Sequence, residues 1–218
     1  MVVRLGSPQV FKDRKEAGKL LANALSDINL DIKKGIILGL PRGGVMVAAE
    51  IAKDLKLPVD IIVTRKIGAP GNAEFALAAV DADGEFVADE KYRWENEYYI
   101  EEQAQKEKDE IKRRLKKYRG KDIHANLKGK KIILVDDGIA TGQTMISAIR
   151  FSKKHGAKIV YVAVPVLPAD TIAEIEDEAD GLFYLYAPEA FWAVGQFYVD
   201  FPQVTDEEVV SFIGKVNN

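Results

Sequence analysis

The segment at residues 131–144, KIILVDDGIATGQT, constrains the fold of this chain more than any other. Its short, continuous and branched apolar run predicts a strand buried on both faces. Two adjacent acids, Asp136 and Asp137, follow that run, and a glycine-containing loop leads into a predicted helix at 143–155. A buried strand that passes through a tight loop into a helix is the building unit of a parallel α/β sheet.

The same unit recurs on both sides of this segment. Strands are predicted at 35–40, 60–65, 131–137, 158–166 and 182–187, and helices at 13–27, 44–56, 143–155 and 169–178. Strands and helices that alternate through short links predict parallel pairing with right-handed crossovers. The expected fold class is therefore α/β, a Rossmann-like open parallel sheet with helices on both faces.

The region between the second and third of these strands breaks the alternation. The segments 77–80 and 85–89, joined by the turn DADG, predict a hairpin. A long charged helix with a thin apolar seam is predicted at 96–119, after a loop KIGAPGN at 66–72. We expect one domain over 1–218, with its core at about 30–187 and an appendage at about 70–125 that borders the site.

Composition excludes several classes of protein. The chain has no cysteine, which removes disulfides, thiol nucleophiles and cysteine zinc sites, and its two histidines argue against a histidine-built metal centre. Its 31 basic and 34 acidic residues give a net charge of −3, so no partner nucleic acid is expected. The basic run at 112–121 is better explained as the solvated face of a salt-bridged helix. Short apolar runs and the absence of a signal-like N-terminus predict a cytoplasmic protein without a membrane partner.

The loop after the two acids predicts an anion site. Backbone N–H groups at the start of the following helix, with the hydroxyls of Thr141 and Thr144, can hold a phosphate. Asp136 and Asp137 face the same crevice, where a diol or a hydrated divalent cation can bind. A sugar phosphate suits this pair of subsites, at the carboxyl end of a parallel sheet. The alternative, an ordinary strand–turn–helix with an acidic cap, would make the acids, the glycine and both threonines coincidental.

Three segments resemble the type I phosphoribosyltransferase family. IILVDDGIATGQT, at 132–144, resembles the phosphoribosyl-pyrophosphate (PRPP) motif at every diagnostic position. LPRGG, at 40–44, resembles the pyrophosphate loop, which in this family often has a non-proline cis peptide. VTRKIGAPGN, at 63–72, is similar to the Arg-Lys-x-Gly segment of adenine phosphoribosyltransferases. The resemblance covers roughly residues 36–200 and implies the type I fold with a small hood over the base, from the N-terminal or the 188–203 segment or both.

The resemblance also implies a role for each matching residue. Asp136 and Asp137 would hold the ribose diol, directly or through Mg²⁺, which makes Mg²⁺ the expected cofactor and PRPP the co-substrate. Arg65 and Lys66 would neutralise the leaving pyrophosphate, and with the two acids they form the expected catalytic set. The other expected PRPP-binding residues are Pro41, Arg42, Gly43, Gly44, Gly138, Ala140, Thr141, Gly142, Gln143 and Thr144.

Two features of the resemblance conflict on the identity of the base. The tail FWAVGQFYVDF, at 191–201, is similar to the segment of hypoxanthine-guanine enzymes in which an aromatic ring stacks on the purine. Ala140, however, stands where those enzymes have an Asp, and matches the adenine enzymes. The base stays open, with a purine favoured over a pyrimidine. The base-binding residues expected on this basis are Phe191, Trp192, Val194 and Asp200.

Each of the two segments that could form the hood could instead have a purely structural role. The aromatic tail could instead form core and dimer packing. At the N-terminus, Phe11, Asp13 and Arg14 could cover the base, or could simply begin a capped helix. A second capped helix is expected at the C-terminus, opened by Thr205 with Glu208 at the capping-box position.

The leading hypothesis is a Mg²⁺-dependent transferase that moves the phosphoribosyl group of PRPP to a nitrogenous base and releases pyrophosphate. Its expected partners are these small molecules and a second copy of itself, in a homo-oligomer that we expect to be a dimer. The alternative is a non-catalytic PRPP or nucleotide sensor on the same fold. The Arg65-Lys66 pair and the complete pyrophosphate loop favour catalysis, because a sensor can lose leaving-group residues. A PRPP synthetase is disfavoured, since those enzymes duplicate the domain and no ATP-binding segment is visible.

Overall fold

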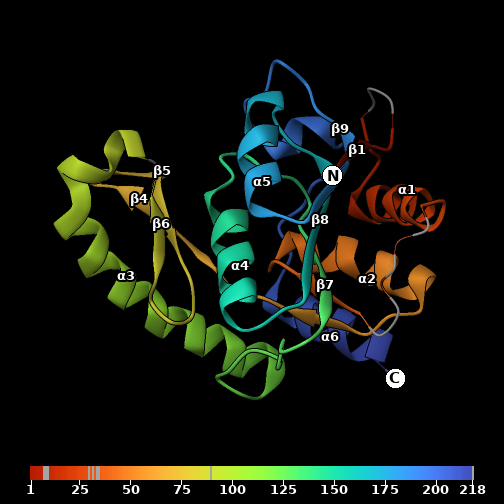
Figure 1. The fold of residues 1–218 in the computed structure, drawn as a ribbon, viewed down its shortest axis with the longest axis horizontal. Helices are drawn as coiled ribbons and strands as arrows, with labels where there is room; N and C mark the ends of the chain where they lie inside the picture. The colour runs from red at the N-terminus through yellow and green to blue at the C-terminus, as the bar shows by residue number, and fades with distance from the viewer. Residues whose placement is uncertain (7–9, 29, 31, 33–34, 89, 218) are drawn as a thin grey trace.

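The computed structural model describes residues 1–218 except 7–9, 29, 31, 33–34, 89 and 218 (Figure 1). Its strands are β1 (Val2–Arg4), β2 (Ile36–Gly39), β3 (Val59–Ile61), β4 (Arg65–Ala69), β5 (Asn72–Val80), β6 (Phe86–Ala88), β7 (Lys131–Val135), β8 (Ile159–Val166) and β9 (Gly181–Tyr186). Its helices are α1 (Arg14–Ser26), α2 (Gly43–Leu55), α3 (Glu90–Arg119), α4 (Gln143–Lys154), α5 (Ile172–Glu178) and α6 (Asp206–Asn217), with 3-10 turns η1 (Ala169–Thr171) and η2 (Val194–Phe197).

The main sheet is parallel throughout, and helices cover both of its faces. Its strand order is β1-β9-β8-β7-β2-β3. In β7, Ile132 and Leu134 join the core under α4 and α5, whereas Ile133 and Val135 join the core under α1 and α2 (Figure 1). This alternation explains why the strand reads as a continuous apolar run, because both of its faces are buried. The predicted α/β class and the interior position of this strand are confirmed.

The chain winds outward from the centre of this sheet in two directions. From β2 it proceeds to β3 on one side, and from β7 it proceeds through β8 to β9 on the other. β2 and β7 lie next to each other, with Gly39 opposite Val135. The loops that follow these two strands therefore meet at a topological switch point, where open α/β sheets bind their ligands.

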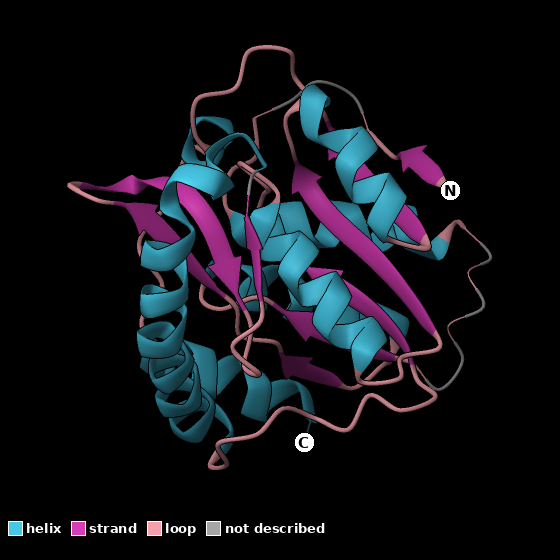
Figure 2. Cartoon of the chain, turned by 60° about the vertical axis from the view of Figure 1, so that its left-hand side comes forward, coloured by secondary structure: helices cyan, strands magenta, loops and turns pink. Residues whose placement is uncertain are grey.

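The appendage is a three-stranded antiparallel sheet, β4-β5-β6, packed against the long helix α3 (Figure 2). The predicted hairpin is its β5–β6 pair, and residue 89 of that prediction lies outside the described residues. Two expectations were wrong. The segment 66–72 is mostly strand β4 and its turn, and the strand predicted at 60–65 ends at Ile61. Ile67 and Leu77 bury their side chains against the apolar seam of α3, and this burial outweighs the glycines and proline nearby.

The two ends of the chain extend the main sheet and its cover beyond the expected core. β1 pairs with β9, and no sequence pattern predicted this strand.

Helix α3 begins at Glu90, before its predicted start at 96. The capping box of α6 is confirmed: Thr205 Oγ1 accepts from Glu208 N at 3.2 Å, and Thr205 N donates to Glu208 Oε2 at 2.8 Å. Within the described part of the chain, no helix combines the length and the apolar character that crossing a membrane requires.

Candidate functional site

Two loops and two helix N-termini converge on the acid pair. The loop at 40–44 follows β2 and opens α2, and the loop at 136–142 follows β7 and opens α4. Leu40 N donates to Val135 O at 2.8 Å, which joins the two loops at their base. The first N–H groups of a helix have no partner within the helix, and its N-terminus is electropositive. The two carboxylates are therefore flanked by two places that favour an anion.

Gly43 and Gly44 let the first loop lie directly against the acids. A Cβ on Gly43 would come within 1.8 Å of Asp137 Oδ2, and one on Gly44 within 2.7 Å of Asp136 Cα. No side chain fits at either position without moving the acids. The Pro41–Arg42 peptide bond is cis, as the resemblance implied for this loop. Arg42 itself is exposed and Pro41 is half-buried.

The two acids have different surroundings. Asp137 Oδ2 accepts from Arg14 Nε at 2.6 Å, and the two side chains are only 14% and 7% exposed. Asp136 Oδ1 accepts from the backbone N of Asp137 at 2.8 Å. Loss of hydration and the neighbouring Asp137 carboxylate raise the pKa of Asp136 well above its ordinary value. Arg14 thus supplies a positive charge to Asp137. A further positive charge would be needed beside Asp136 to ionise that carboxyl fully.

The loop at 138–144, which the sequence predicts to bind a phosphate, leads into the N-terminus of α4. Ala140 and Thr141 are exposed, and Gly142 caps α4 with a φ of +82°, a left-handed conformation that favours glycine. Gln143 is only 8% exposed, so its side chain lies largely within the protein. Thr144 is half-buried at the first turn of α4.

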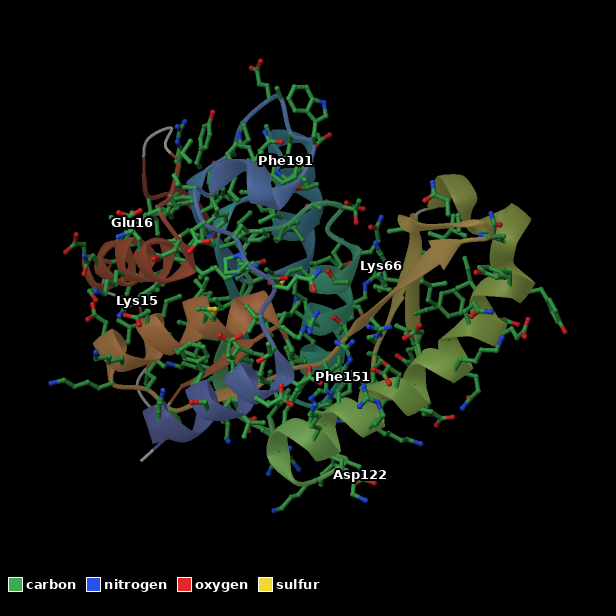
Figure 3. All side chains as sticks on the ribbon, turned by 180° about the vertical axis from the view of Figure 1, so that it is seen from behind. Lys15, Glu16, Lys66, Asp122, Phe151 and Phe191 are labelled. Carbon is green, nitrogen blue, oxygen red and sulfur yellow. The ribbon has the colours of Figure 1, made fainter. Side chains whose placement is uncertain are left out.

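Arg65 and Lys66 begin β4, a strand of the appendage. Thr64 Oγ1 donates to Thr144 O at 3.1 Å and so anchors this strand to the first turn of α4. Arg65 Nε pairs with Glu107 Oε2 of α3 at 2.6 Å. Lys66 is exposed on the side of the appendage that faces α4 (Figure 3). A cavity of about 310 Å³ is lined by residues of β4 and α3, namely Arg65, Lys66, Ile67, Gly68, Ala69, Tyr99, Gln103 and Glu107.

The four residues expected to bind the base occupy three kinds of environment. Val194 touches the loop at 138–144, since a Cβ on Gly138 would come within 2.5 Å of Val194 Cγ1. Phe191 packs against Phe197, with ring centroids 5.2 Å apart, near the top of the molecule in Figure 3. Trp192 is 88% exposed, and Asp200 is also exposed. The structure thus brings Val194 to the loops and leaves Trp192 with little protein around its ring.

The sequence did not predict the contacts that Arg14 and Tyr198 make with Asp137. Tyr198 Oη donates to Asp137 O at 2.6 Å, and the Tyr198 ring stacks on Phe201 with ring centroids 4.8 Å apart. Arg14 lies over the other residue of that stack, with its Cζ 3.6 Å from the Phe201 ring centroid. Phe11 is completely buried beside Tyr198, with ring centroids 5.3 Å apart, and a hood formed by the N-terminal segment stays a prediction. The sequence around Arg14 indicates a capped helix start at Asp13 but carries no signal for the contact with Asp137.

Comparisons with known proteins agree with this geometry. The family described as "Phosphoribosyl transferase domain" matches residues 10–202. Two curated proteins of Mycobacterium tuberculosis strains, named "Putative phosphoribosyl transferase", are 39% identical over 212 residues, which is 96% of this chain. The chain spans about half, 47%, of the length of these relatives. The crystal structure of TT1426 from Thermus thermophilus is 40% identical, with a TM-score of 0.79, over 96% of this chain and 100% of that one. The chain belongs to the phosphoribosyltransferase family.

Proposed function

We propose that the protein transfers the phosphoribosyl group of PRPP to a nitrogenous base and releases pyrophosphate. One observation carries the proposal: two helix N-termini, those of α2 and α4, flank a pair of carboxylates at the switch point of a parallel sheet. PRPP has the matching pattern of groups, with an anion at each end and a diol between them. The 5-phosphate would bind at 138–144, the pyrophosphate at 41–44 and the diol at Asp136 and Asp137.

The residues at the pyrophosphate side suit the charge that develops in this reaction. Breaking the anomeric bond builds positive charge on the ribose and sheds a multiply charged anion. The backbone N–H groups at 42–44 and the cations Arg65 and Lys66 would meet that anion, and preorganised donors of this kind contribute much of the rate in comparable sites. No protein nucleophile is needed for the displacement, which agrees with a chain that has no cysteine.

Magnesium fits this site as a partner of the substrate rather than as a resident ion. Among the described residues, no group of three or more His, Cys, Asp or Glu side chains is placed to hold a metal. Mg²⁺ usually binds one or two carboxylates and completes its shell with water and substrate oxygens. Asp136 and Asp137 would supply those carboxylates, and the ion would neutralise charge on the leaving pyrophosphate.

For the acceptor we propose a purine. The support is the likeness of the 191–201 tail to purine-stacking segments, together with the contact of Val194 with Gly138 at the base of the phosphate loop. Trp192 is the largest flat apolar surface of that tail, and its exposure leaves the ring accessible to a planar ligand.

A PRPP or nucleotide sensor is the second candidate, and one contact favours it. Arg65 Nε is paired with Glu107 Oε2 at 2.6 Å. The Glu107 carboxylate therefore already neutralises the positive charge of Arg65 that would stabilise a leaving pyrophosphate. If that pair persists when PRPP binds, Arg65 contributes little to turnover. The transferase proposal requires the guanidinium to leave Glu107 and meet the pyrophosphate.

Pyrophosphate release from PRPP and Mg²⁺, measured with a panel of purine and pyrimidine bases, tests the proposal. We expect base-dependent release that falls about 10²-fold or more in kcat for Arg65→Ala, with a smaller change in KM for PRPP, if chemistry limits the rate. Arg113→Ala is the matched control, because Arg113 also pairs with an acid on α3 but is exposed. Binding of PRPP without release for any base would support the sensor and contradict the transferase.

A further inference from the structure

Arg14 is a charged residue that the fold buries against the acid pair. It is 6% exposed, although arginine is rarely buried without several partners. Its Nε donates to Asp137 Oδ2 at 2.6 Å and its Nη1 donates to Pro202 O at 2.7 Å. The central carbon of its guanidinium lies 3.6 Å from the Phe201 ring centroid. A carboxylate, a carbonyl and an aromatic face therefore fix this cation in one position.

The backbone around Arg14 is fixed as firmly as its side chain. Asp13 caps α1 by accepting from Glu16 N at 2.8 Å. Phe11 N donates to Phe197 O, and Val199 N donates to Phe11 O, each at 2.8 Å. The segments at 11–14 and 197–202 thus form one unit behind Asp137, although they are far apart in the sequence.

The pyrophosphate loop completes the enclosure of the Arg14–Asp137 bond. An added Cβ on Gly43 would lie 1.8 Å from Asp137 Oδ2 and 2.9 Å from Arg14 Nε. The loop, the acid and the arginine therefore share one packed contact. A shift of the Asp137 carboxylate towards this loop would therefore also displace the segment that is expected to hold pyrophosphate.

We propose that Arg14 is a positioning residue of the PRPP site: it holds Asp137 Oδ2, so that Asp136 and the remaining oxygen of Asp137 are the groups that meet the ribose diol or its magnesium ion. This inference rests on the proposed function. Arg14 acts through Asp137 and does not touch the ligand. Supporting partners of this kind typically contribute about 10-fold to 100-fold to the affinity of the site that they orient.

The test is a double-mutant cycle on PRPP binding, measured by calorimetry with Mg²⁺ on the full chain. Arg14→Met should weaken PRPP binding by about 10-fold or more, and Arg14→Lys should recover part of the loss, because its ammonium can still reach one carboxylate oxygen. Asp137→Asn and the double variant Arg14→Met/Asp137→Asn should bind PRPP equally. Equality is expected because the amide that Asp137→Asn introduces is neutral and binds a diol or Mg²⁺ weakly, so that holding its oxygen in place through Arg14 gains little affinity.

A second buried pair provides the matched control. Arg119 binds Asp60 through two hydrogen bonds of 2.8 and 2.9 Å, with side chains 16% and 18% exposed, and belongs to neither loop. Arg119→Met should lower the free energy of unfolding but leave PRPP affinity unchanged. This contrast separates loss of stability from loss of orientation.

Three outcomes would overturn the inference. Wild-type affinity in Arg14→Met would exclude a role for Arg14. A double variant that binds PRPP more weakly than Asp137→Asn would mean that Arg14 reaches the ligand directly. If Arg14→Met does not fold, the comparison of the double variant with Asp137→Asn still tests the role of Arg14. The double variant removes both charges of the pair and so leaves no buried charge without its partner. No PRPP binding by the wild type would overturn the proposed function as well.

Discussion

Replacing Gly43 by alanine should disrupt the contact between the loop at 40–44 and the acids. The added Cβ would lie 1.8 Å from Asp137 Oδ2 and 2.6 Å from Asp137 Cγ. An ordinary contact between such atoms is about 3.4 Å or longer. The carboxylate would have to withdraw by about 1.5 Å, more than its 2.6 Å bond to Arg14 can accommodate.

The loss in the free energy of unfolding depends on which group moves to relieve this clash. If the carboxylate moves, the buried ion pair breaks, which costs about 3–5 kcal/mol. If the backbone moves instead, the cost is that of an overpacked core, about 1–3 kcal/mol. We therefore expect a loss of about 2–4 kcal/mol in the free energy of unfolding. That is a large part of the total stability of a single domain.

Urea unfolding of Gly43→Ala and of a control glycine variant measures this loss. Gly214, in α6, has no heavy atom within 4 Å of an added Cβ. Gly214→Ala should be neutral or stabilising by up to about 1 kcal/mol, because alanine favours the helix. A midpoint for Gly43→Ala that matches the wild type, with an unchanged slope, would refute the close approach of Gly43 to Asp137.

Three further predictions concern other parts of the molecule. Burial lowers the pKa of His124 from 6.5 to about 4, so the folded protein binds this proton more weakly than the unfolded chain. The contribution of neutral His124 is complete above pH 6.5 and is lost as the pH falls towards 4. In urea unfolding, the change in stability from pH 7 to pH 5 should therefore be about 2 kcal/mol more destabilising in the wild type than in His124→Phe, and equal changes in the two proteins would contradict this burial. A nucleoside monophosphate should change Trp192 fluorescence in a Trp94→Phe background, and Trp192→Ala should raise KM for the base while sparing PRPP affinity; unchanged emission and KM would make the tail a packing element. Thr205→Ala should lower the unfolding free energy by about 1 kcal/mol, since it removes the cap of α6, and a loss below about 0.3 kcal/mol would contradict the capping box.

The sequence predicted those parts of the fold whose signals are local. β7 is buried on both faces, so its apolar run, the two acids and the following glycine loop were all visible in one segment. The loop at 40–44 carried the same kind of signal after β2. Both loops follow the carboxyl ends of parallel strands, which lie at one edge of a sheet, so the type of site was predictable, whereas the pairing of β2 with β7 came from the structure.

The remaining parts depend on contacts between distant segments. β1 is only three residues long and partly exposed, so it has no periodicity to detect. β4 carries Gly68 and ends beside a proline, and only its pairing with β5 and its burial under α3 make it a strand. Local propensity cannot report such tertiary stabilisation.

Arg14 shows the same limit within the site. It is 123 residues from Asp137 in the sequence, and nothing near it indicates which acid it meets. The sequence offered a capped helix start at Asp13, and that expectation was correct. The pairing of Arg14 with Asp137 could be identified only from the structure, in which the segments at 11–14 and 197–202 pack next to Asp137.

PRPP affinity of the Asp136→Asn/Asp137→Asn variant tests the central claim most directly. The variant removes two carboxylates from a desolvated site while it keeps their shape. Calorimetry with Mg²⁺ should show a loss of about 10²-fold or more in PRPP affinity relative to the wild type. Urea unfolding of the same sample confirms that the variant is folded. Unchanged PRPP affinity in a folded double variant would contradict the assignment of the acid pair, and with it the proposed site.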